Sequence, residues 1–354
     1  MTYAALHTRA CALFGVKYPI VQTGMGWVAG ARLTSATSEA GGLGILAAAT
    51  MTLEQLEKAI AEVKSRTKNP FGVNLRTDQD DVGARVHLLI REKVKVASFA
   101  QAPSKEIVKR LKGEGIVTMP TIGARRHAEK MASYGVDAVI AQGHEGGGHT
   151  GAVPTSILLP DVTRAVDIPV LGAGGFLDGR GLVAALAFGA AGIAMGTRFL
   201  LTKESTVPDA VKAIYLKTTV TGTVVTKSID GHPQRVIRTA LVDAFEKAGA
   251  IGSHVRALKH AWDFRSITET SMFALVKEGF AMQKKGEMSW AQMAMAANAP
   301  MLTKASMVDG RPEVGILPTG QGVGVIDELP TVAELVARIM TEAEATLSRL
   351  GAAS

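Results

Sequence analysis

Strand-like apolar runs alternate with amphipathic helical patterns eight times within residues 1–201 of this 354-residue chain. We expect the eight strands at residues 20–23, 43–47, 71–74, 94–99, 117–120, 138–142, 169–172 and 192–196. Because these runs are apolar almost throughout, they are typical of a parallel sheet that is buried on both faces. Alternating βα units build either a closed eight-stranded barrel or an open doubly wound sheet. Eight units favour the barrel, so we predict an α/β fold of the (β/α)8 TIM-barrel class.

The alternation stops after the eighth strand. Helical patterns then dominate, at residues 233–247, 266–283 and 290–297, before a last helix at 331–350. We therefore predict two domains. Residues 1–201 and 309–354 form the barrel, and residues 202–308 form a smaller, mainly helical domain that caps the substrate.

Glycine and polar residues gather where the expected strands end. In a barrel the carboxyl ends of all eight strands share one face, whereas in an open sheet they would spread along an edge. We expect the following residues to converge on one mouth: Gly24, Met25, Gly26, Asn74, Gln142, Gly174, Gly175, Gly196 and Thr197.

The sixth strand leads into a loop with two histidines, Gln-Gly-His-Glu-Gly-Gly-Gly-His. A zincin-type metal site needs two histidines one helical turn apart, but His144 and His149 are separated by three glycines that disfavour a helix. We therefore expect no metal. A lone histidine commonly just bonds a loop carbonyl, yet the glycines leave space for a ligand, which favours His149 as a catalytic base. His144 is interpreted as a structural residue or a substrate contact.

The last two strands each end in a small-residue loop, at residues 172–175 and 196–197. In barrel enzymes the loops after strands seven and eight often hold a phosphate through backbone N–H groups. Two tight turns would be the alternative. Near the start, Gly24, Gly26 and Gly30 lack the dinucleotide spacing and instead suit a backbone that lies against a planar ligand.

The net charge is +7 with a pI near 9.4, but the basic residues are scattered and aromatic residues make up 5%. This distribution, with no nucleic-acid motif, favours an anionic cofactor or substrate over nucleic acid. No apolar segment is long enough to span a bilayer, and the N-terminus lacks a signal-peptide pattern. With Cys11 as the single cysteine, we expect a cytoplasmic protein.

Taken together, these motifs resemble the nitronate monooxygenase family, formerly called 2-nitropropane dioxygenases. The similarity runs from about residue 15 to residue 340 and rests on YPIVQTGMGWVAG, AGGLGIL, PFGVNL, DAVIAQGHEGGGHTG, IPVLGAGGFLDGRGLVAALAFGAAGIAMGTRFL and the late TGQG. The resemblance implies a TIM barrel with a smaller helical domain and one non-covalently bound FMN.

The resemblance also implies roles for individual residues. The flavin ring would be lined by Gly24, Met25 and Gly26 and bonded by Asn74 and Gln142, with Gln321 nearby. The phosphate would be held by Gly147, Gly172, Ala173, Gly174, Gly175, Gly196 and Thr197. His149 would be the base, and His144 and Trp27 are candidates for substrate contact.

One departure bears on the substrate. Many family members have Glu-Ala-Gly-Gly-His, whereas this chain has glycine at position 146. Together with GMGWVAGAR and TVPDAVK, this is similar to members associated with steroid-ring breakdown, which are thought to act on acyl-CoA intermediates. The expected substrate is thus a small molecule, either a CoA thioester or a nitronate. An NAD(P)H-dependent flavin reductase and a non-redox barrel that binds a phosphorylated ligand are the alternatives, and a homodimer is one option for the assembly.

Overall fold

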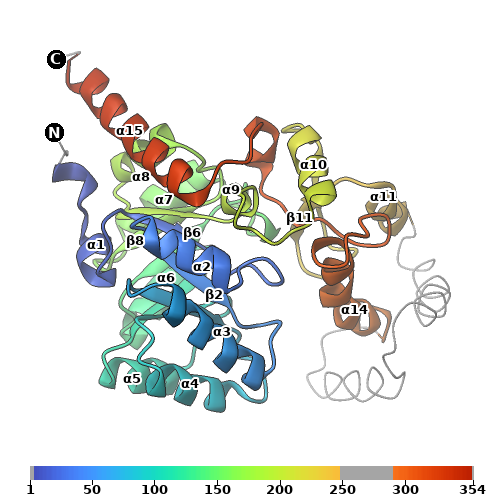
Figure 1. Cartoon of the computed structure of the whole chain (residues 1–354), viewed down its shortest axis with the longest axis horizontal. Coiled ribbons are helices and arrows are strands. Elements are labelled where there is room, and N and C mark those ends of the chain that lie inside the picture. The colour runs from blue at the N-terminus through green and yellow to red at the C-terminus, as the bar shows by residue number, and fades with distance from the viewer. Residues whose placement is uncertain (1–3, 248–289, 353–354) are drawn as a thin grey trace.

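The eight expected strands form a closed parallel barrel in the computed structural model, which describes residues 4–247 and 290–352 (Figure 1). β9 closes the barrel by pairing with β1, with Ile193 opposite Ile20. The TIM-barrel prediction is therefore confirmed. The barrel strands are β1 (Ile20–Gln22), β2 (Leu43–Ala47), β3 (Phe71–Leu75), β4 (Val96–Phe99), β5 (Val117–Ile122), β6 (Val139–Gln142), β8 (Val170–Ala173) and β9 (Gly192–Met195).

The core has two apolar layers, as the continuous apolar runs require. One layer contains strand residues such as Ile45, Met119 and Leu171, and Phe14 of α1 (Arg9–Phe14) packs into the same cluster. The other layer lies between the strands and the outer helices, for example Val73 of β3 against Leu56 of α3. Short strands are sufficient because both of their faces are buried.

Seven outer helices follow the strands in turn, and three of them begin with a side-chain cap. Thr52 and Gln55 form the expected capping box of α3, and Ser104 caps α5. The helices are α2 (Ala31–Glu39), α3 (Leu53–Arg66), α4 (Val82–Arg91), α5 (Lys105–Gly113), α6 (Arg125–Tyr134), α7 (Thr155–Thr163) and α8 (Gly179–Ala187).

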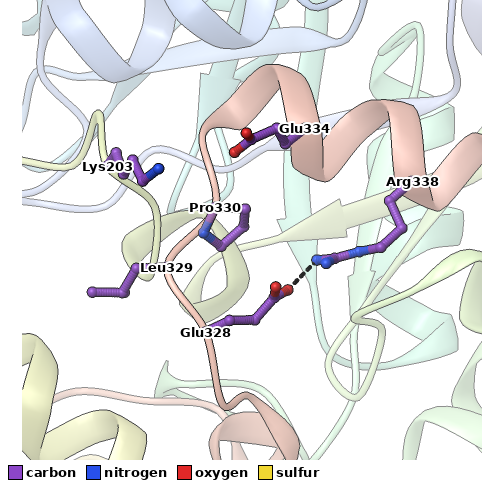
Figure 2. A pocket seen from close by; sticks show the side chains of 6 residues that line it. All are labelled: Lys203, Glu328, Leu329, Pro330, Glu334 and Arg338. Carbon is purple, nitrogen blue, oxygen red and sulfur yellow. Dashed lines mark ion pairs between the residues drawn. The ribbon is translucent and has the colours of Figure 1, made fainter.

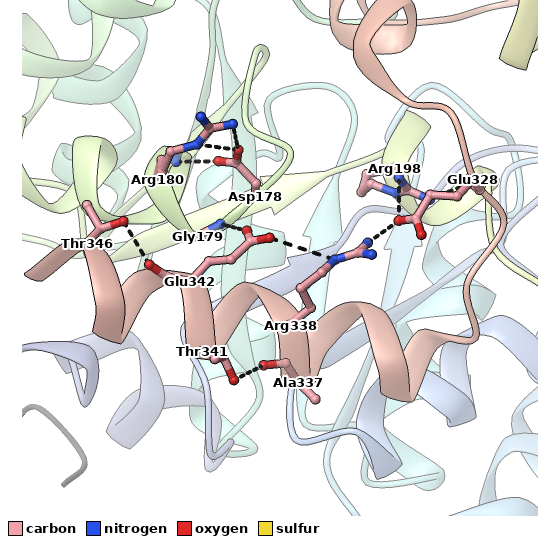
Figure 3. A network of polar contacts seen from close by, with 11 residues as sticks. Asp178, Gly179, Arg180, Arg198, Glu328, Ala337, Arg338, Thr341, Glu342 and Thr346 are labelled. Carbon is pink, nitrogen blue, oxygen red and sulfur yellow. Dashed lines mark hydrogen bonds and ion pairs between the residues drawn. The ribbon is translucent and has the colours of Figure 1, made fainter.

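The eighth barrel helix is α15 (Val332–Gly351), which begins far along the chain from β9. It packs against α8 and α2 and so fills the place between the first and the seventh helix (Figure 1). A polar network shown in Figure 3 holds it there: Arg338 pairs with Glu328, and Glu342 accepts the N–H of Gly179 at 3.0 Å. Residues 196–331 are thus inserted between the last strand and the last helix of the barrel.

The insertion contains a β-hairpin as well as helices. β10 and β11 pair antiparallel, and β11 also pairs with β7 (Gly148–His149) from the loop after β6. The described elements are α9 (Thr197–Leu200), α10 (Asp209–Lys217), β10 (Thr223–Thr226), β11 (Gln234–Ile237), α11 (Ala240–Lys247), α14 (Trp290–Met307) and the 3-10 helix η2 (Gln321–Val325).

The prediction of a helix at 233–247 was wrong in its first part, which is strand β11, whereas its second part contains α11. The reason is tertiary: the buried Val236 packs with Ile229 and Ile316, and strand pairing overrides a weak helical pattern. The helix expected at 290–297 is confirmed as the start of α14. The one expected at 266–283 lies outside the described residues, and the domain boundaries stay predictions. In the described ranges, no helix is long and apolar enough to cross a membrane.

Candidate active site

The loop after β6 returns across the barrel mouth as the short strand β7. Gln142, the last residue of β6, donates from Nε2 to the backbone oxygen of His149 at 2.6 Å. His149 and Gly148 pair with Gln234 and Arg235 of β11. The inserted hairpin and the barrel strand therefore fix the backbone of His149 together.

The ring of His149 is held by a carboxylate from the inserted segment. Its Nε2 lies 2.6 Å from Oδ2 of Asp230, whose side chain is 9% exposed, while the His149 side chain is 65% exposed. Oδ1 of Asp230 accepts the backbone N–H of His232 at 3.1 Å. Burial acts to raise the pKa of Asp230, but the hydrogen bond and charge of His149 and the His232 N–H outweigh it, so that pKa is lowered. Asp230 thus orients Nε2 of His149, while most of the histidine side chain is exposed.

Asp230 was missed by the sequence reasoning. It is 81 positions from His149 in the chain and lies in a Ser-Ile-Asp-Gly-His turn with no catalytic motif. Only the pairing of β7 with β11 brings the two residues together. A signal was present in the Val-rich run before the turn, which could have been interpreted as the first strand of a hairpin.

The loops after β8 and β9 present backbone donors at the mouth. Gly174 and Gly175 have φ values of +93° and +82°, which favour glycine. Within the described part of the chain, the N–H groups of Gly174, Gly175 and Thr197 donate to no protein acceptor. Free N–H groups at these two loops suit a phosphate.

A late loop joins these donors from the far end of the insertion. The N–H of Gly320 donates to Oγ1 of Thr197 at 2.8 Å, and the backbone N–H of Gln321 donates to the backbone oxygen of Glu145 at 2.9 Å. Gly147 approaches the same loop so closely that a Cβ on it would lie 2.5 Å from the Gly320 nitrogen. The structure therefore brings Gly147, Thr197 and Gln321 together.

The neighbouring side of the mouth is built by the loop after β1, because β1 pairs with β9. A Cβ on Gly24 would lie 2.4 Å from the Cβ of Asn74, so this backbone lies directly on the end of β3. Asn74 is buried and donates to Ser98 at 3.2 Å. Met25 lies near Gly196, whose Cβ would be 3.4 Å from its sulfur atom. Backbone with no projecting side chain would suit a planar ring.

Three predicted residues lie less favourably for ligand contact. Gly172 is buried within β8, where a Cβ would meet Phe176 at 2.7 Å, so its missing side chain serves packing. Ala173 is also buried, and its carbonyl accepts the Gly143 N–H at 2.9 Å. Nδ1 of His144 bonds the Gly151 oxygen at 2.8 Å, which favours the structural role over substrate contact.

Arg235 is a second residue that the sequence reasoning missed. It is buried on β11 and donates to the backbone oxygen of His144 at 3.1 Å and to Thr223 at 2.9 Å. Burial lowers its pKa, and the charge of Glu145 partly offsets this effect. Arg235 thereby braces the histidine loop against the hairpin.

A cavity of about 500 Å³ lies at the start of α15 (Figure 2). Its Glu328 pairs with Arg338, and its Glu334 accepts the backbone N–H of Thr331 at 2.7 Å. These charged groups already have structural partners, so we assign the cavity no ligand. It is lined by Lys203, Glu328, Leu329, Pro330, Glu334 and Arg338.

A family model for nitronate monooxygenase matches residues 7–85 and 82–342 of the chain. The chain belongs to the nitronate monooxygenase family. This confirms the resemblance, and the protein is an oxidoreductase. Across the residues that the structure describes, no group of three or more His, Cys, Asp or Glu side chains is placed to hold a metal ion.

Several relatives of this nitronate monooxygenase-family protein cover nearly its whole length. One from Rhodococcus jostii (strain RHA1) is 54% identical over 349 residues, which is 99% of each chain, and is named (3aS,4S,5R,7aS)-5-hydroxy-7a-methyl-1-oxo-octahydro-1H-indene-4-carboxyl-CoA dehydrogenase. The likeness to members that act on ring-derived acyl-CoA is thus confirmed. The structure of FabK from Thermotoga maritima has a TM-score of 0.82 at 33% identity and covers 98% of this chain and 99% of its own. Nitroalkane oxidase from Streptomyces ansochromogenes has a TM-score of 0.76 at 27% identity and covers 95% of this chain and 99% of its own.

Proposed function

We propose that this chain is an FMN-dependent oxidoreductase that oxidises a ring-derived acyl-CoA, with His149 as the proton-accepting base. The observation that carries the proposal is the 2.6 Å contact between His149 and Asp230 beside loops with free backbone donors. The printed name of the Rhodococcus relative, a hydroxy-bearing carboxyl-CoA dehydrogenase, supports the substrate class.

The residues of the mouth fit FMN at both ends of that molecule. Gly174, Gly175 and Thr197 would bind its phosphate, with Gly147, Gly196 and Ala173 forming the surrounding backbone. Gly24, Met25 and Gly26 would lie against its ring, with Asn74, Gln142 and Gln321 as polar neighbours. FMN, when bound, supplies the two-electron acceptor of the reaction.

His149 would remove the proton from the hydroxyl group that is oxidised, while the hydrogen on the carbon that bears this hydroxyl leaves with its electron pair, for which bound FMN would be the acceptor. Asp230 then stabilises the positive charge that develops on the ring of His149 and keeps Nε2 in one orientation. The exposed remainder of the ring leaves Nδ1 free to face the substrate. Asp230 is a positioning residue in this scheme, because it touches His149 and not the substrate.

Anaerobic reduction of the bound flavin tests the proposal. We expect the purified protein to be yellow and to be reduced by a hydroxy-ring acyl-CoA without NAD(P)H. His149→Ala should retain FMN and lose at least about a hundredfold in the reduction rate, as is typical for a general base. Unchanged reduction by this variant would remove His149 from the mechanism.

Two other family activities have clear signatures in the same experiment. Oxygen uptake with an alkyl nitronate, but not with the acyl-CoA, would favour a nitronate monooxygenase in the strict sense. Reduction by NAD(P)H alone would favour a flavin reductase. A colourless protein that gains no absorbance from added FMN would favour the non-redox alternative.

The Asp230→Asn variant distinguishes a role of Asp230 in orienting His149 from a role in folding. This variant keeps the size of the side chain and removes its charge, so we expect kcat to fall by about tenfold or more while KM stays similar. Asp230→Glu should recover part of the lost rate because it restores the carboxylate. An Asp230→Asn enzyme with wild-type kcat would show that the contact with His149 has no kinetic role.

A further inference from the structure

A second, smaller cavity of about 270 Å³ lies beside Trp27. It lies between the loop after β1 and the loop after β2, and residue 206 of the inserted segment borders it. Trp27 lines it and follows directly on Gly24–Gly26, the backbone assigned to the flavin ring. Pockets that enclose a whole small ligand usually measure about 300–1,000 Å³, so this one suits part of a ligand that continues into the mouth.

The described side chains that line this cavity are all uncharged. Trp27, Val28 and Met51 supply apolar surface, while hydroxyl and amide groups come from Thr50, Gln55 and Thr206. A phosphate or carboxylate would find no cation among them. A neutral chain that alternates methylene and amide groups matches both kinds of surface.

The walls of the cavity are held in place before any ligand binds. The guanidinium of Arg85, whose side chain is 3% exposed, donates to the backbone oxygens of Ala48 at 2.9 Å and Met51 at 2.7 Å. On the other wall, the N–H of Ala47 donates to the Ala29 oxygen at 3.0 Å. Binding would therefore require little ordering of the protein.

Trp27 adopts a backbone conformation that few bulky residues take, with φ of +65°. Such strained conformations cluster at ligand clamps. Its indole N–H donates to the Pro300 oxygen of α14 at 3.1 Å, and its backbone N–H contacts Oγ1 of Thr50 at 3.4 Å. The strained residue thus holds its indole as one wall of the cavity.

We propose that this cavity binds the pantetheine arm of a CoA thioester and so directs the acyl group to His149. This inference rests on the proposed function, because it assumes an acyl-CoA substrate. It adds the surface that would determine specificity for the CoA part of the substrate. This surface is the neutral, pre-formed cavity between the loops after β1 and β2. The phosphates of CoA would lie outside the cavity.

Gly30 offers a direct way to fill the cavity. It lines the cavity, its backbone is extended (φ −84°, ψ −175°), and a Cβ there meets nothing within 4 Å. Gly30→Leu would therefore place an isobutyl group into the cavity without a backbone clash. Gly30→Ala adds a smaller group and should weaken ligand binding less. Gly83→Leu is the matched control, because Gly83 also has nothing within 4 Å but belongs to α4.

Calorimetric titration of the FMN-loaded protein with CoA and with free pantetheine tests this inference. We expect Gly30→Leu to weaken both ligands at least tenfold, Gly30→Ala less, and Gly83→Leu not at all. FMN content and thermal midpoint are measured for each variant, and the Ala variant keeps the test valid should the Leu variant fold poorly. Equal affinities of the wild type and a folded Gly30→Leu for both ligands would overturn the proposal.

The same titration separates this inference from the proposed function. CoA binding that depends on Gly30, in a protein whose flavin is not reduced by acyl-CoA, would uphold the cavity and refute the oxidation. If acyl-CoA reduces the flavin equally well in the wild type and in Gly30→Leu, the oxidation is upheld and the role of the cavity is refuted. Loss of NADH binding, but not of CoA binding, in Gly30→Leu would assign the cavity to a nicotinamide cofactor and also overturn the proposal.

Discussion

At the scale of single residues, Gly146 is where we expect this chain to differ from many members of its family. A Cβ there would lie 2.7 Å from the side chain of Gln142. Because that side chain is flexible, we expect Gly146→Ala to fold but to push Gln142 from its hydrogen bond to His149. One such bond is worth about 0.5–1.5 kcal/mol, so flavin reduction should slow by roughly tenfold or less.

Stopped-flow reduction under anaerobic conditions measures this effect. Gly151→Ala is the control, because it lies in the same loop and its Cβ would meet only ordinary contacts at 3.4 Å or more. Wild-type rates in Gly146→Ala would mean that Gln142 does not fix the position of His149.

The acid side of the stability curve gives a second prediction at this scale. The folded pKa of Asp230 is lowered, against the opposing effect of burial, by His149 and the His232 N–H. A carboxyl group of this kind stabilises the fold fully above its unfolded pKa of about 3.9 and loses that effect as the pH falls through its lower folded pKa. The difference in unfolding free energy between wild type and Asp230→Asn should therefore shrink as the pH falls from about 5 to below about 4. Urea titrations across this range measure it, and a difference that grows in acid would contradict the assignment.

Residue identities were predictable where a strand end fixed them. Asn74, Gln142 and Thr197 follow apolar runs directly, so the barrel topology alone placed them at one mouth. Asp230 could not be predicted in this way, because its proximity to His149 depends on pairing between distant, short strands. Gly172 shows a different limit: the Phe176 ring requires a glycine there, and the sequence does not distinguish packing from ligand approach.

At the scale of elements, the close contact of α8 with α15 is specific enough to test. A Cβ on Gly179 would lie 2.3 Å from the backbone nitrogen of Ala343 and 2.4 Å from the Ile339 oxygen. Backbone atoms cannot move aside cheaply, so we expect Gly179→Ala to destabilise the protein by about 1–3 kcal/mol or more. Gly181→Ala, two residues on in the same helix, meets only contacts of 3.4 Å or longer and should be neutral or stabilise by up to about 1 kcal/mol.

Thermal unfolding of the two variants, with FMN content recorded, decides between these expectations. A lowered midpoint in both variants would indicate that alanine is harmful anywhere in this helix, and the close contact with α15 would then explain nothing.

The elements themselves were largely predictable because a strand buried on both faces has a simple signature. All eight barrel strands were found from their apolar runs, and α3 from its capping box. The hairpin β10–β11 was missed, because its strands are short and half polar and their stability comes from pairing with β7 and from the contacts of Val236. The residues before α11 illustrate how tertiary contacts override a local helical tendency.

At the scale of the whole molecule, the proposed cofactor site draws on segments from both ends of the chain. The phosphate donors follow β8 and β9, the late loop at Gly320 precedes α15, and the ring side follows β1. A ligand that bridges these segments binds only the folded state, so it should raise the unfolding free energy by mass action, by about 2.7 kcal/mol at a hundred times its Kd.

The comparison of FMN with riboflavin tests whether the loops after β8 and β9 contribute to this stabilisation by binding the phosphate. Both ligands carry the same ring, but only FMN has the phosphate that Gly174, Gly175 and Thr197 would bind through their free N–H groups. We therefore expect added FMN to raise the thermal midpoint of the cofactor-free protein clearly more than riboflavin at equal concentration. Inorganic phosphate should give a smaller shift than FMN and compete with it, because it occupies the same donors without bridging to the loop after β1. Equal shifts from FMN and riboflavin would show that the loops after β8 and β9 are tight turns and not a phosphate site.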